Sequence, residues 1–471
     1  MGKLSGLKPE AVFGYFEELC AIPHGSGHTD TVSRWLTDFA AKNGLSAQRD
    51  EYNNVIIRKP ASPGYEDHPT VILQGHMDMV WDKDPDCPVD LAKDGLDVDV
   101  DGDWVFAHGT TLGGDDGIAV AMAMAILTDD TLPHPPLEVL ITSDEETGMD
   151  GAAGLDASRL TGRTLINIDS EEEGVLTVGC AGGARADITL PAVRLPSSGD
   201  AYRVTVGGLI GGHSGVEIDK GRLNADVLLG RFLCALPAGW RLSAIEGGAR
   251  DNAIPRQAAA VIFTQSDPAP LARAFCRENT VPADPGLTVT AEKVPAPAAA
   301  LSPEDSRRMA DFLAAVKNGV QAMSRELPGL VETSLNLGVL RLTEDGLTAS
   351  FSVRSSKSGE KTALLRDLEA AAAAYGGTVT AHGHYPAWEY RRESPLRETM
   401  VAAYRELTKK EPTVMTIHAG LECGILGEKL PGLDAVSFGP EMQNVHTSRE
   451  RLSVSSVERT YRYLLEVLKR L

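Results

Sequence analysis

The segment VILQGHMD (residues 71–78) decides the fold, because it is a short apolar run that ends in polar side chains. Two later segments have the same form, LEVLITS (137–143) and TLINIDS (164–170). Runs that are apolar throughout are typical of central strands in a mostly parallel sheet whose faces are covered by helices. The sequence therefore predicts an α/β domain built on these three strands.

Helical patterns surround the three runs. Residues 8–20 and 29–43 carry apolar side chains at helical spacing, and residues 117–127 form the longest apolar run of the chain. This last run is too short to cross a bilayer. We expect the three segments to be helices that cover the sheet.

The sequence changes in character near residue 186. Spaced β-like runs such as YRVTVGGL and AAAVIFTQ lead to a capping box at residues 302–305, which predicts a helix that extends to about Ser324. A strand pair, TSLNLGVLRL and LTASFSVRSS, and an Ala- and Leu-rich helix at residues 359–375 follow. These elements predict an α+β segment.

Domain boundaries follow from this change. A length of 471 residues is enough for two or three domains at about 150 residues each. We predict one catalytic α/β domain, interrupted by an inserted α+β domain that acts as a lid or in dimerisation. The first comprises residues 1–185 and 386–471, and the second comprises residues 186–385.

Composition restricts the classes of protein. The chain has 45 Lys and Arg against 66 Asp and Glu, a net charge of −21. Nucleic-acid binding proteins neutralise phosphates with a basic surface, so this class is excluded. The six cysteines include no C-x-x-C pair, and the N-terminus shows no apolar signal segment. We expect a cytoplasmic protein without a membrane or nucleic-acid partner.

Polar residues follow each of the three predicted strands. In open α/β sheets, ligands bind beyond the carboxyl ends of the strands. Those ends carry His76 and Asp78, Glu145 and Glu146, and Asp169. His76 and Asp78 are two positions apart and share one face of an extended chain, so Asp78 can support a metal-bound imidazole. One rim of the sheet is therefore a candidate site.

The acidic pairs allow two interpretations. Of Glu145 and Glu146, one can bind a metal while the other takes a proton from water, or both can belong to a solvated loop. The small residues in GGDDG (113–117) allow close approach to a site. For Asp116 we favour a simpler role, an acidic residue at a helix start that interacts with the helix dipole.

Residues 97–102 imitate a calcium loop with acids at alternate positions. The twelfth position would be His108, whereas an EF-hand needs a bidentate Glu there. The stretch is instead predicted to be a hairpin with Asp-Gly at its turn. The chain also contains neither a G-x-S-x-G elbow nor a P-loop.

Taken together, LQGHMDMV, GTTLGGDDGIAVA, TSDEETGMDGA, NIDSEEEG and GPEMQNVHTSRERL resemble the co-catalytic zinc metallopeptidases. This superfamily includes aminoacylases, deacetylases, tripeptidases and dipeptidases. The sequence is most similar to its aminoacylhistidine (Xaa-His) dipeptidase branch, from the first helix to the last. The resemblance implies a zinc-exopeptidase-like domain with an inserted lid.

The resemblance also implies a metal centre with two divalent ions. Asp115 would bridge them, His76 and Asp169 would complete the shell of one ion, and Glu146 and His446 that of the other. Zn²⁺ suits this donor set, with Co²⁺ or Mn²⁺ as substitutes.

The same resemblance assigns roles around the metals. Asp78 would orient His76, and Glu145 would be the general base for attack by a water that bridges the ions. His213 would support the oxyanion, from the same or a partner subunit of a homodimer. The other implied substrate contacts are Asn252, Arg354, His418 and Gly420, with Glu422 as a weaker candidate.

The expected function is hydrolysis of Xaa-His and other short unblocked dipeptides. Two alternatives stay open. A related metal-dependent amidohydrolase, such as an N-acyl amino acid deacylase or a tripeptidase-like enzyme, would use the same residues. A non-catalytic relative that only binds would not need Glu145 and a full set of ligands, all of which are present.

Overall fold

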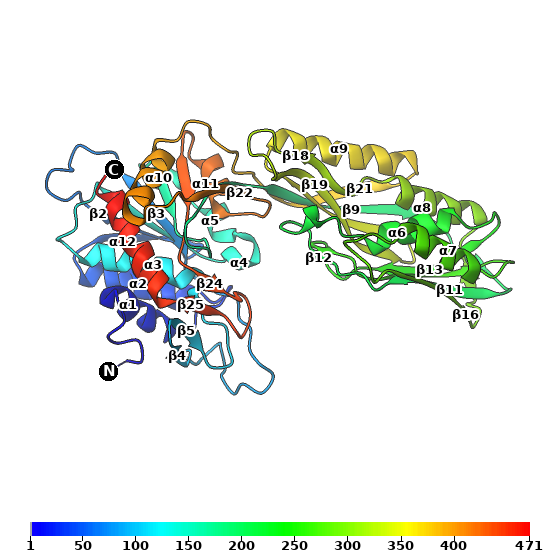
Figure 1. Cartoon of the computed structure of the whole chain (residues 1–471), viewed down its shortest axis with the longest axis horizontal. Helices are drawn as coiled ribbons and strands as arrows, with labels where there is room; N and C mark the ends of the chain where they lie inside the picture. The colour runs from blue at the N-terminus through cyan, green and yellow to red at the C-terminus, as the bar shows by residue number, and fades with distance from the viewer. Residues whose placement is uncertain (1) are drawn as a thin grey trace. The chain divides into compact units, whose positions relative to one another are not determined.

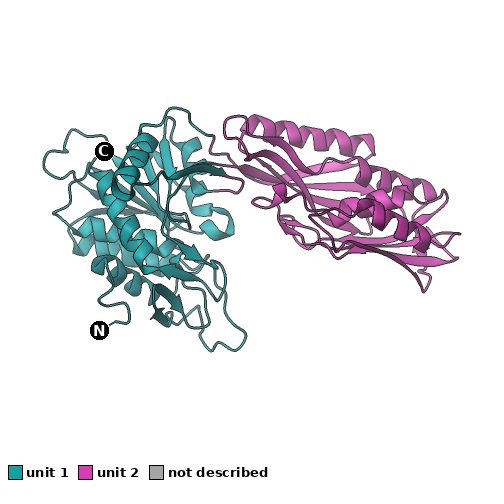
Figure 2. Cartoon of the chain, viewed as in Figure 1, with its two compact units in different colours: residues 1–179, 390–416, 421–471 teal, residues 180–389, 417–420 magenta. Residues whose placement is uncertain are grey.

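The structure, a computed structural model, describes residues 2–471. The chain forms two compact units, shown in different colours in Figure 2. Unit 1 comprises Met1–Gly179, Tyr390–Thr416 and Leu421–Leu471, and unit 2 comprises Cys180–Glu389 and Ile417–Gly420.

The second unit begins at Cys180, six residues before the domain boundary predicted at residue 186. Strand β9 (Gly182–Pro191) pairs over its whole length with β20 (Gly346–Ser355), so the earlier residues of β9 also belong to unit 2. The short segment Ile417–Gly420 belongs to unit 2 as well, although it lies within the range assigned to the first domain.

Unit 1 contains an eight-stranded sheet, as far as residues 2–471 show (Figure 1). Its order is β1-β2-β6-β3-β7-β23-β8-β22. The bounds are β1 Ser46–Arg49, β2 Val55–Lys59, β6 Leu137–Thr142, β3 Val71–His76, β7 Thr164–Asn167, β23 Asp434–Ser437, β8 Val175–Cys180 and β22 Thr413–Ile417.

The sheet is parallel at its centre and antiparallel at its flanks. Strands β6, β3, β7 and β23 run parallel, whereas β1, β2 and β8 pair antiparallel with their neighbours. The prediction of a mostly parallel sheet therefore holds for the central strands, which are the apolar ones. The edge strand β1 alternates between exposed and half-buried residues, as expected for a strand with one solvated face.

Helices cover this sheet. They are α1 Glu10–Cys20, α2 Asp30–Lys42, α3 Gly114–Thr128, α4 Glu145–Gly148, α5 Asp150–Gly154, α10 Pro395–Thr408, α11 Glu422–Lys429 and α12 Val454–Leu468, with a 3₁₀ turn at Ala157–Arg159. Helix α3 is buried from Gly114 to Leu127 because it is apolar all round, and it packs against α1 and β3. The predicted helices at 8–20, 29–43 and 117–127 are thus confirmed as α1, α2 and α3.

The acidic stretch that resembles a calcium loop, residues 97–102, lies at a small four-stranded sheet within the described part of unit 1. Strands β4 (Val98–Asp101) and β5 (Trp104–Ala107) pair antiparallel, with Gly102 at φ 59° in the turn. The other two strands are β24 (Met442–Gln443) and β25 (Arg451–Ser453). The predicted hairpin is confirmed.

Unit 2 is built on an antiparallel sheet of nine strands among the described residues. Besides β9 and β20 these are β11 Ala201–Gly207, β13 Arg241–Gly247, β15 Ala258–Phe263, β16 Thr288–Val294, β18 Gly319–Met323, β19 Val331–Leu342 and β21 Thr378–Tyr385. Short pairs are formed by β10 Leu195–Pro196 with β17 Ala299–Ala300 and by β12 Gly212–His213 with β14 Ala253–Ile254.

Four helices belong to the described part of this unit, together with a 3₁₀ turn at Ile218–Lys220 (Figure 1). They are α6 Ala225–Cys234, α7 Ala269–Asn279, α8 Pro303–Ala315 and α9 Ser358–Ala374. Helices α6, α8 and α9 pack on the sheet around a core that includes Phe232, Phe312 and Phe351. Unit 2 therefore has a hydrophobic core of its own.

The helix expected from Pro303 to about Ser324 is shorter than predicted. Its start is confirmed, because the Ser302 hydroxyl accepts a hydrogen bond from the Asp305 amide at 3.0 Å. It ends at Ala315 because the chain reverses through Gly319, at φ 82°, and enters β18, which pairs with β19. Pairing with a strand distant in sequence overrides the local helical pattern.

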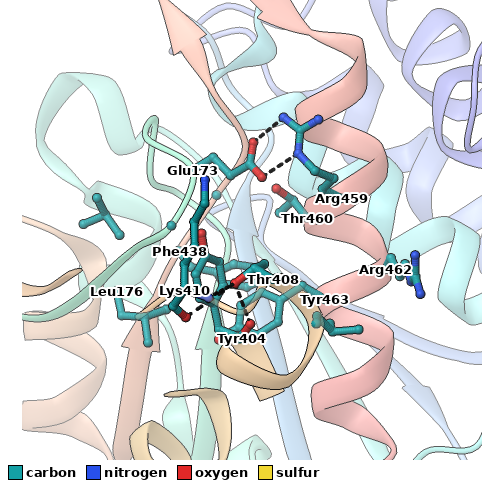
Figure 3. Close-up of a pocket in the computed structure, with 14 residues that line it drawn as sticks. Glu173, Leu176, Tyr404, Thr408, Lys410, Phe438, Arg459, Thr460, Arg462 and Tyr463 are labelled. Atoms are coloured by element: carbon teal, nitrogen blue, oxygen red, sulfur yellow. Dashed lines mark hydrogen bonds and ion pairs between the residues drawn. The ribbon is translucent and has the colours of Figure 1, made fainter. Parts of the chain in front are cut away.

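Within residues 2–471, no helix is long and apolar enough to cross a membrane. Unit 1 contains a cavity of about 340 Å³ bordered by β8, α10 and α12 (Figure 3). Glu173 and Arg459 at this cavity form an ion pair with a shortest distance of 2.6 Å, and Tyr404 and Tyr463 meet edge to face nearby. The predicted metal ligands lie elsewhere in the unit.

Candidate metal centre

His76 is the last residue of β3, the strand that decides the fold. Its side chain is buried, and its Nδ1 atom lies 3.0 Å from the backbone oxygen of Asp78 and 3.4 Å from the Asp78 carboxylate. Both neighbours are acceptors, so they hold a proton on Nδ1 and leave Nε2 as the nitrogen that would bind a metal. This is the orientation that a metal-binding imidazole requires.

Asp115, at the start of α3, faces two histidines. One carboxylate oxygen lies 3.2 Å from His76 Nε2 and the other lies 3.2 Å from His446 Nε2. Burial favours the neutral form of Asp115, but hydrogen bonds with His446 and His76 keep its pKa below the ordinary value. The two oxygens of a single carboxylate thus point toward two different nitrogen ligands.

The remaining predicted ligands complete the cluster. Glu146 Oε1 lies 2.7 Å from His446 Nε2, and Asp169 Oδ1 lies 3.8 Å from His76 Nε2. Hydrogen bonds with Asp115 and Glu146 raise the pKa of His446 to about 11. Ligand atoms of three residues fall within 4.8 Å of one another in three sets, which are His76, Asp116 and Asp169; His76, Glu145 and Glu146; and Asp115, Glu146 and His446.

The cluster fits divalent cations. Burial raises the pKa of Asp169 well above its ordinary value, and its buried Oδ2 atom has no hydrogen-bond partner in the described chain. A buried acceptor without a partner is costly, and a cation would satisfy it. Imidazole nitrogens and carboxylate oxygens are donors that Zn²⁺ accepts, and Co²⁺ and Mn²⁺ accept the same set.

Asp116 does not have the simple role expected of it. It is fully buried, its backbone is not helical, and its carboxylate accepts a hydrogen bond from the His76 backbone amide at 3.2 Å. An acid that only complements a helix dipole would lie in solvent. The expectation was wrong because the whole α3 segment is buried, and Asp116 lies with it beside the predicted ligands His76 and Asp169.

Asp78 joins two parts of the centre. Besides facing His76, its carboxylate accepts hydrogen bonds from the backbone amides of Glu145 at 3.1 Å and Glu146 at 3.4 Å. The Ser26 hydroxyl donates a further bond at 2.8 Å. One buried carboxylate therefore orients the imidazole and the loop that carries the two glutamates.

Glu145 begins the short helix α4 and has an unusual acidity. Burial raises its pKa to about 8, with nearby His76 opposing the shift and Glu422 adding to it. Glu422 itself is buried, and its Oε2 atom accepts hydrogen bonds from Gln74 and Thr142, each at 2.6 Å. Glu422 thus lies among polar groups under the centre and not on a surface open to substrate.

Sequence reasoning missed Glu450. This residue is only 3% exposed, and its carboxylate accepts hydrogen bonds from backbone amides of the loop that precedes α3. Its position four residues after His446 gave no signal, because an acid near a predicted ligand is common in an acidic chain. Only the folded structure brings the two segments together.

The predicted substrate residues other than Glu422 belong to unit 2, whereas Glu422 belongs to unit 1. Arg354, on β20, donates a hydrogen bond to the Tyr385 hydroxyl at 2.9 Å, and its buried Nε atom has no partner in the described residues. His418 Nε2 lies 2.7 Å from the Ser334 hydroxyl. Burial, with a contribution from Arg354, lowers the pKa values of both His213 and His418, the latter to about 3.

The other two predicted contacts lie outside the helices and strands of the same unit. The backbone oxygen of Asn252 accepts a hydrogen bond from the Ser214 amide at 2.8 Å, next to His213 on β12. Gly420 ends the segment Ile417–Gly420. The backbone oxygen of His418 lies so close to Gly215 that a Cβ atom there would approach it to 2.5 Å. His213, Asn252 and His418 are therefore parts of one local arrangement.

A sheet with parallel central strands, whose ends gather histidines and carboxylates around Asp115, is typical of the class of α/β metallohydrolases. The chain belongs to Peptidase family M20/M25/M40, whose sequence profile matches residues 72–470. The predictions of this family, of the α/β fold class and of a peptidase are confirmed.

Relatives resemble the chain over its whole length. It is 37% identical over 480 residues to the cytosol non-specific dipeptidase of Escherichia coli (strain K12), covering 100% of this chain and 99% of that protein. The crystal structure of aminoacylhistidine dipeptidase from Vibrio alginolyticus matches with a TM-score of 0.92 and 36% identity, covering 100% of this chain and 98% of that one.

More distant structures share the fold. Aminopeptidase PepT from Bacillus cereus matches with a TM-score of 0.57 and 15% identity over 98% of both chains. This likeness concerns the fold alone. The full-length relatives at 36–37% identity are the ones that bear on function.

Proposed function

We propose that the chain is a two-metal dipeptidase that hydrolyses Xaa-His and other short unblocked dipeptides. The proposal rests on the geometry of Asp115, whose two carboxylate oxygens lie 3.2 Å from His76 Nε2 and 3.2 Å from His446 Nε2. The names of the two full-length relatives, a non-specific dipeptidase and an aminoacylhistidine dipeptidase, support the substrate class.

In this proposal Asp115 would be shared between two divalent ions. His76 and Asp169 would hold the first ion, and Glu146 and His446 would hold the second. Zinc is our first choice, with cobalt or manganese as substitutes. When bound, such ions lower the pKa of water and polarise the scissile carbonyl, so no covalent intermediate is needed.

The chain's own residues supply the proton transfer. Glu145 accepts a proton from the attacking water and passes it to the departing amine, because an amine leaves poorly without a proton. Asp78 keeps the His76 ring and the Glu145 amide in place through the contacts described above. Asp78 is thus a positioning residue in this proposal and Glu145 the general base.

Unit 2 supplies recognition in the proposal. His213 stabilises the oxyanion, from its own chain or from a partner in a homodimer. The planar fork of Arg354 suits a peptide carboxylate. Asn252, His418 and Gly420 complete the contacts. We also place the enzyme in the cytoplasm, in agreement with the name of the Escherichia coli relative.

A dipeptide panel with defined metals tests the proposal. We expect a chelator to abolish hydrolysis of Xaa-His dipeptides, and Zn²⁺ or Mn²⁺ to restore it. N-acetyl amino acids at equal concentration should react far more slowly. If N-acetyl amino acids are hydrolysed faster than Xaa-His dipeptides, the enzyme is a deacylase instead. If the chain binds fewer than one ion tightly and hydrolyses no substrate, it is a binding protein.

The variant Glu145→Gln tests the general base. The amide cannot take a proton, so we expect kcat to fall by about 10²–10⁴-fold while both ions stay bound. Glu172→Gln, which changes an exposed acid, is the control and should react like the parent chain. Metal content by atomic absorption and steady-state kinetics provide the measurements, and turnover near that of the control would reject this role of Glu145.

A further inference from the structure

Glu450 binds the backbone that leads into Asp115. Its Oε2 atom accepts hydrogen bonds from the amides of Leu112 at 2.7 Å and Gly113 at 3.0 Å. Its Oε1 atom accepts from Gly114 at 2.7 Å and from Asp115 itself at 3.3 Å. Four consecutive backbone N–H groups thus converge on one buried carboxylate.

The two glycines make this contact possible. Gly113 adopts φ 68°, a left-handed conformation, and a Cβ there would lie 2.9 Å from the Met79 sulfur. A Cβ at Gly114 would lie 3.2 Å from Glu450 Oε1. The local sequence is therefore suited to receive a carboxylate at this point.

Glu450 also connects the two residues that face each other across the centre. It lies four residues after His446, whose Nε2 is 3.2 Å from Asp115 Oδ2. The intervening loop is fixed, because the Glu450 amide donates to the Thr447 backbone oxygen at 3.0 Å and the Thr447 hydroxyl donates to the Asn444 backbone oxygen at 2.7 Å. A displacement of Glu450 would therefore move Asp115 relative to His446.

We infer that Glu450 is a positioning residue of the metal centre, which sets the orientation of the Asp115 carboxylate toward His446. The inference rests on the proposed function, since it assumes that Asp115 and His446 bind divalent ions. Partners that orient metal ligands typically change metal affinity 10–100-fold when they are replaced. A purely structural cap would instead affect stability alone.

The test compares Glu450→Gln with a matched variant. A glutamine amide would direct its own N–H groups at two of the four backbone donors, so part of the contact is lost. Glu138→Gln is the control: Glu138 is also buried in unit 1, and it accepts hydrogen bonds from the Thr161 and Gly162 amides at 2.9 and 3.0 Å. Both substitutions remove a buried carboxylate that binds backbone amides.

We expect both variants to melt at lower temperature, and only Glu450→Gln to bind Zn²⁺ about 10–100-fold more weakly by chelator competition. The visible absorption of the Co²⁺-loaded protein should change in the same variant and stay unchanged in Glu138→Gln. Glu450→Asp keeps the carboxylate on a side chain that is one methylene shorter. It should fold if the glutamine variant does not, and should show a smaller loss of affinity.

The outcomes separate the two proposals. If the parent chain binds no divalent ion, the proposed function fails. If the parent chain binds two ions, and Glu450→Gln and Glu450→Asp match Glu138→Gln in Zn²⁺ affinity and Co²⁺ spectrum, Glu450 is a structural cap and the inference is overturned.

Discussion

Buried carboxylates of this chain differ in what faces them, and this difference sets their chemistry. Asp115 faces two imidazoles and stays ionised, whereas Glu450 faces backbone amides. Asp226, at the start of α6 in unit 2, faces neither. It is fully buried, and neither of its oxygens has a hydrogen-bond partner among residues 2–471. Such a group is expected to stay neutral in the folded state.

Asp226 predicts a pH dependence of stability. Burial raises its pKa from 3.8 to about 8, with Arg341 opposing the shift. Between these values the folded state holds a proton that the unfolded state has lost. The free energy of unfolding should therefore fall as pH rises from about 4 to 8, by at most about 1.4 kcal/mol per unit from this group.

Asp226→Asn removes this titration and should flatten that part of the stability curve. Urea unfolding of the parent chain and the variant at several pH values measures the difference. Asp219→Asn, on the nearby 3₁₀ turn, is the control because that side chain is more exposed. Equal slopes in the parent chain and Asp226→Asn would mean that Asp226 is ionised in the folded protein.

Single elements show how far the sequence predicts structure. The three apolar runs gave β3, β6 and β7 with nearly correct bounds, because burial on both faces leaves a strong local pattern. The polar residues that follow them were placed correctly at one rim for the same reason. The sequence analysis missed strand β18 and assigned its residues to the end of the preceding helix. No apolar pattern distinguishes β18 from that helix, and β18 is a strand because it pairs with β19.

The site was predicted less completely than the strands. The five proposed ligands follow apolar strands or lie in recognisable motifs, and the structure brings them together. The contact of Glu450 with residues 112–115 and the burial of Asp116 have no local signal. They depend on which segments meet in space, and 335 residues separate Glu450 from Asp115.

The cap of α8 allows a prediction at the scale of an element. Ser302→Ala removes the hydroxyl that accepts from the Asp305 amide, so unit 2 should lose about 1 kcal/mol of unfolding free energy. Chemical denaturation measures the loss. Ser198→Ala changes an exposed serine outside any helix and should have no effect. A stability loss of equal size in both variants would contradict the capping role.

At the scale of the whole molecule, the two units have separate hydrophobic cores. All proposed metal ligands belong to unit 1. An ion that binds only the folded state stabilises that state, by about 2.7 kcal/mol when the free ion is at 100 times its Kd. Zn²⁺ should therefore raise the melting temperature of unit 1 by several degrees and leave the transition of unit 2 unchanged.

Scanning calorimetry with Zn²⁺ and with a chelator measures this difference. Replacing His446 by Ala should reduce the shift, while Arg203→Ala, which removes an exposed ion pair with Glu246 in unit 2, should preserve it. A metal-dependent shift of the unit 2 transition alone would place the ions away from the centre described here.

The position of β23 in the sheet has a consequence for biosynthesis. Strand β23 lies between β7 and β8, and it pairs in parallel with β7 although 270 residues separate Asn167 from Ser437. At 5–20 residues per second, a ribosome needs roughly half a minute to make that stretch. During this time β7 lacks its neighbour and presents an open edge, which favours aggregation. The nascent chain therefore exposes this edge until Asp434–Ser437 has been made.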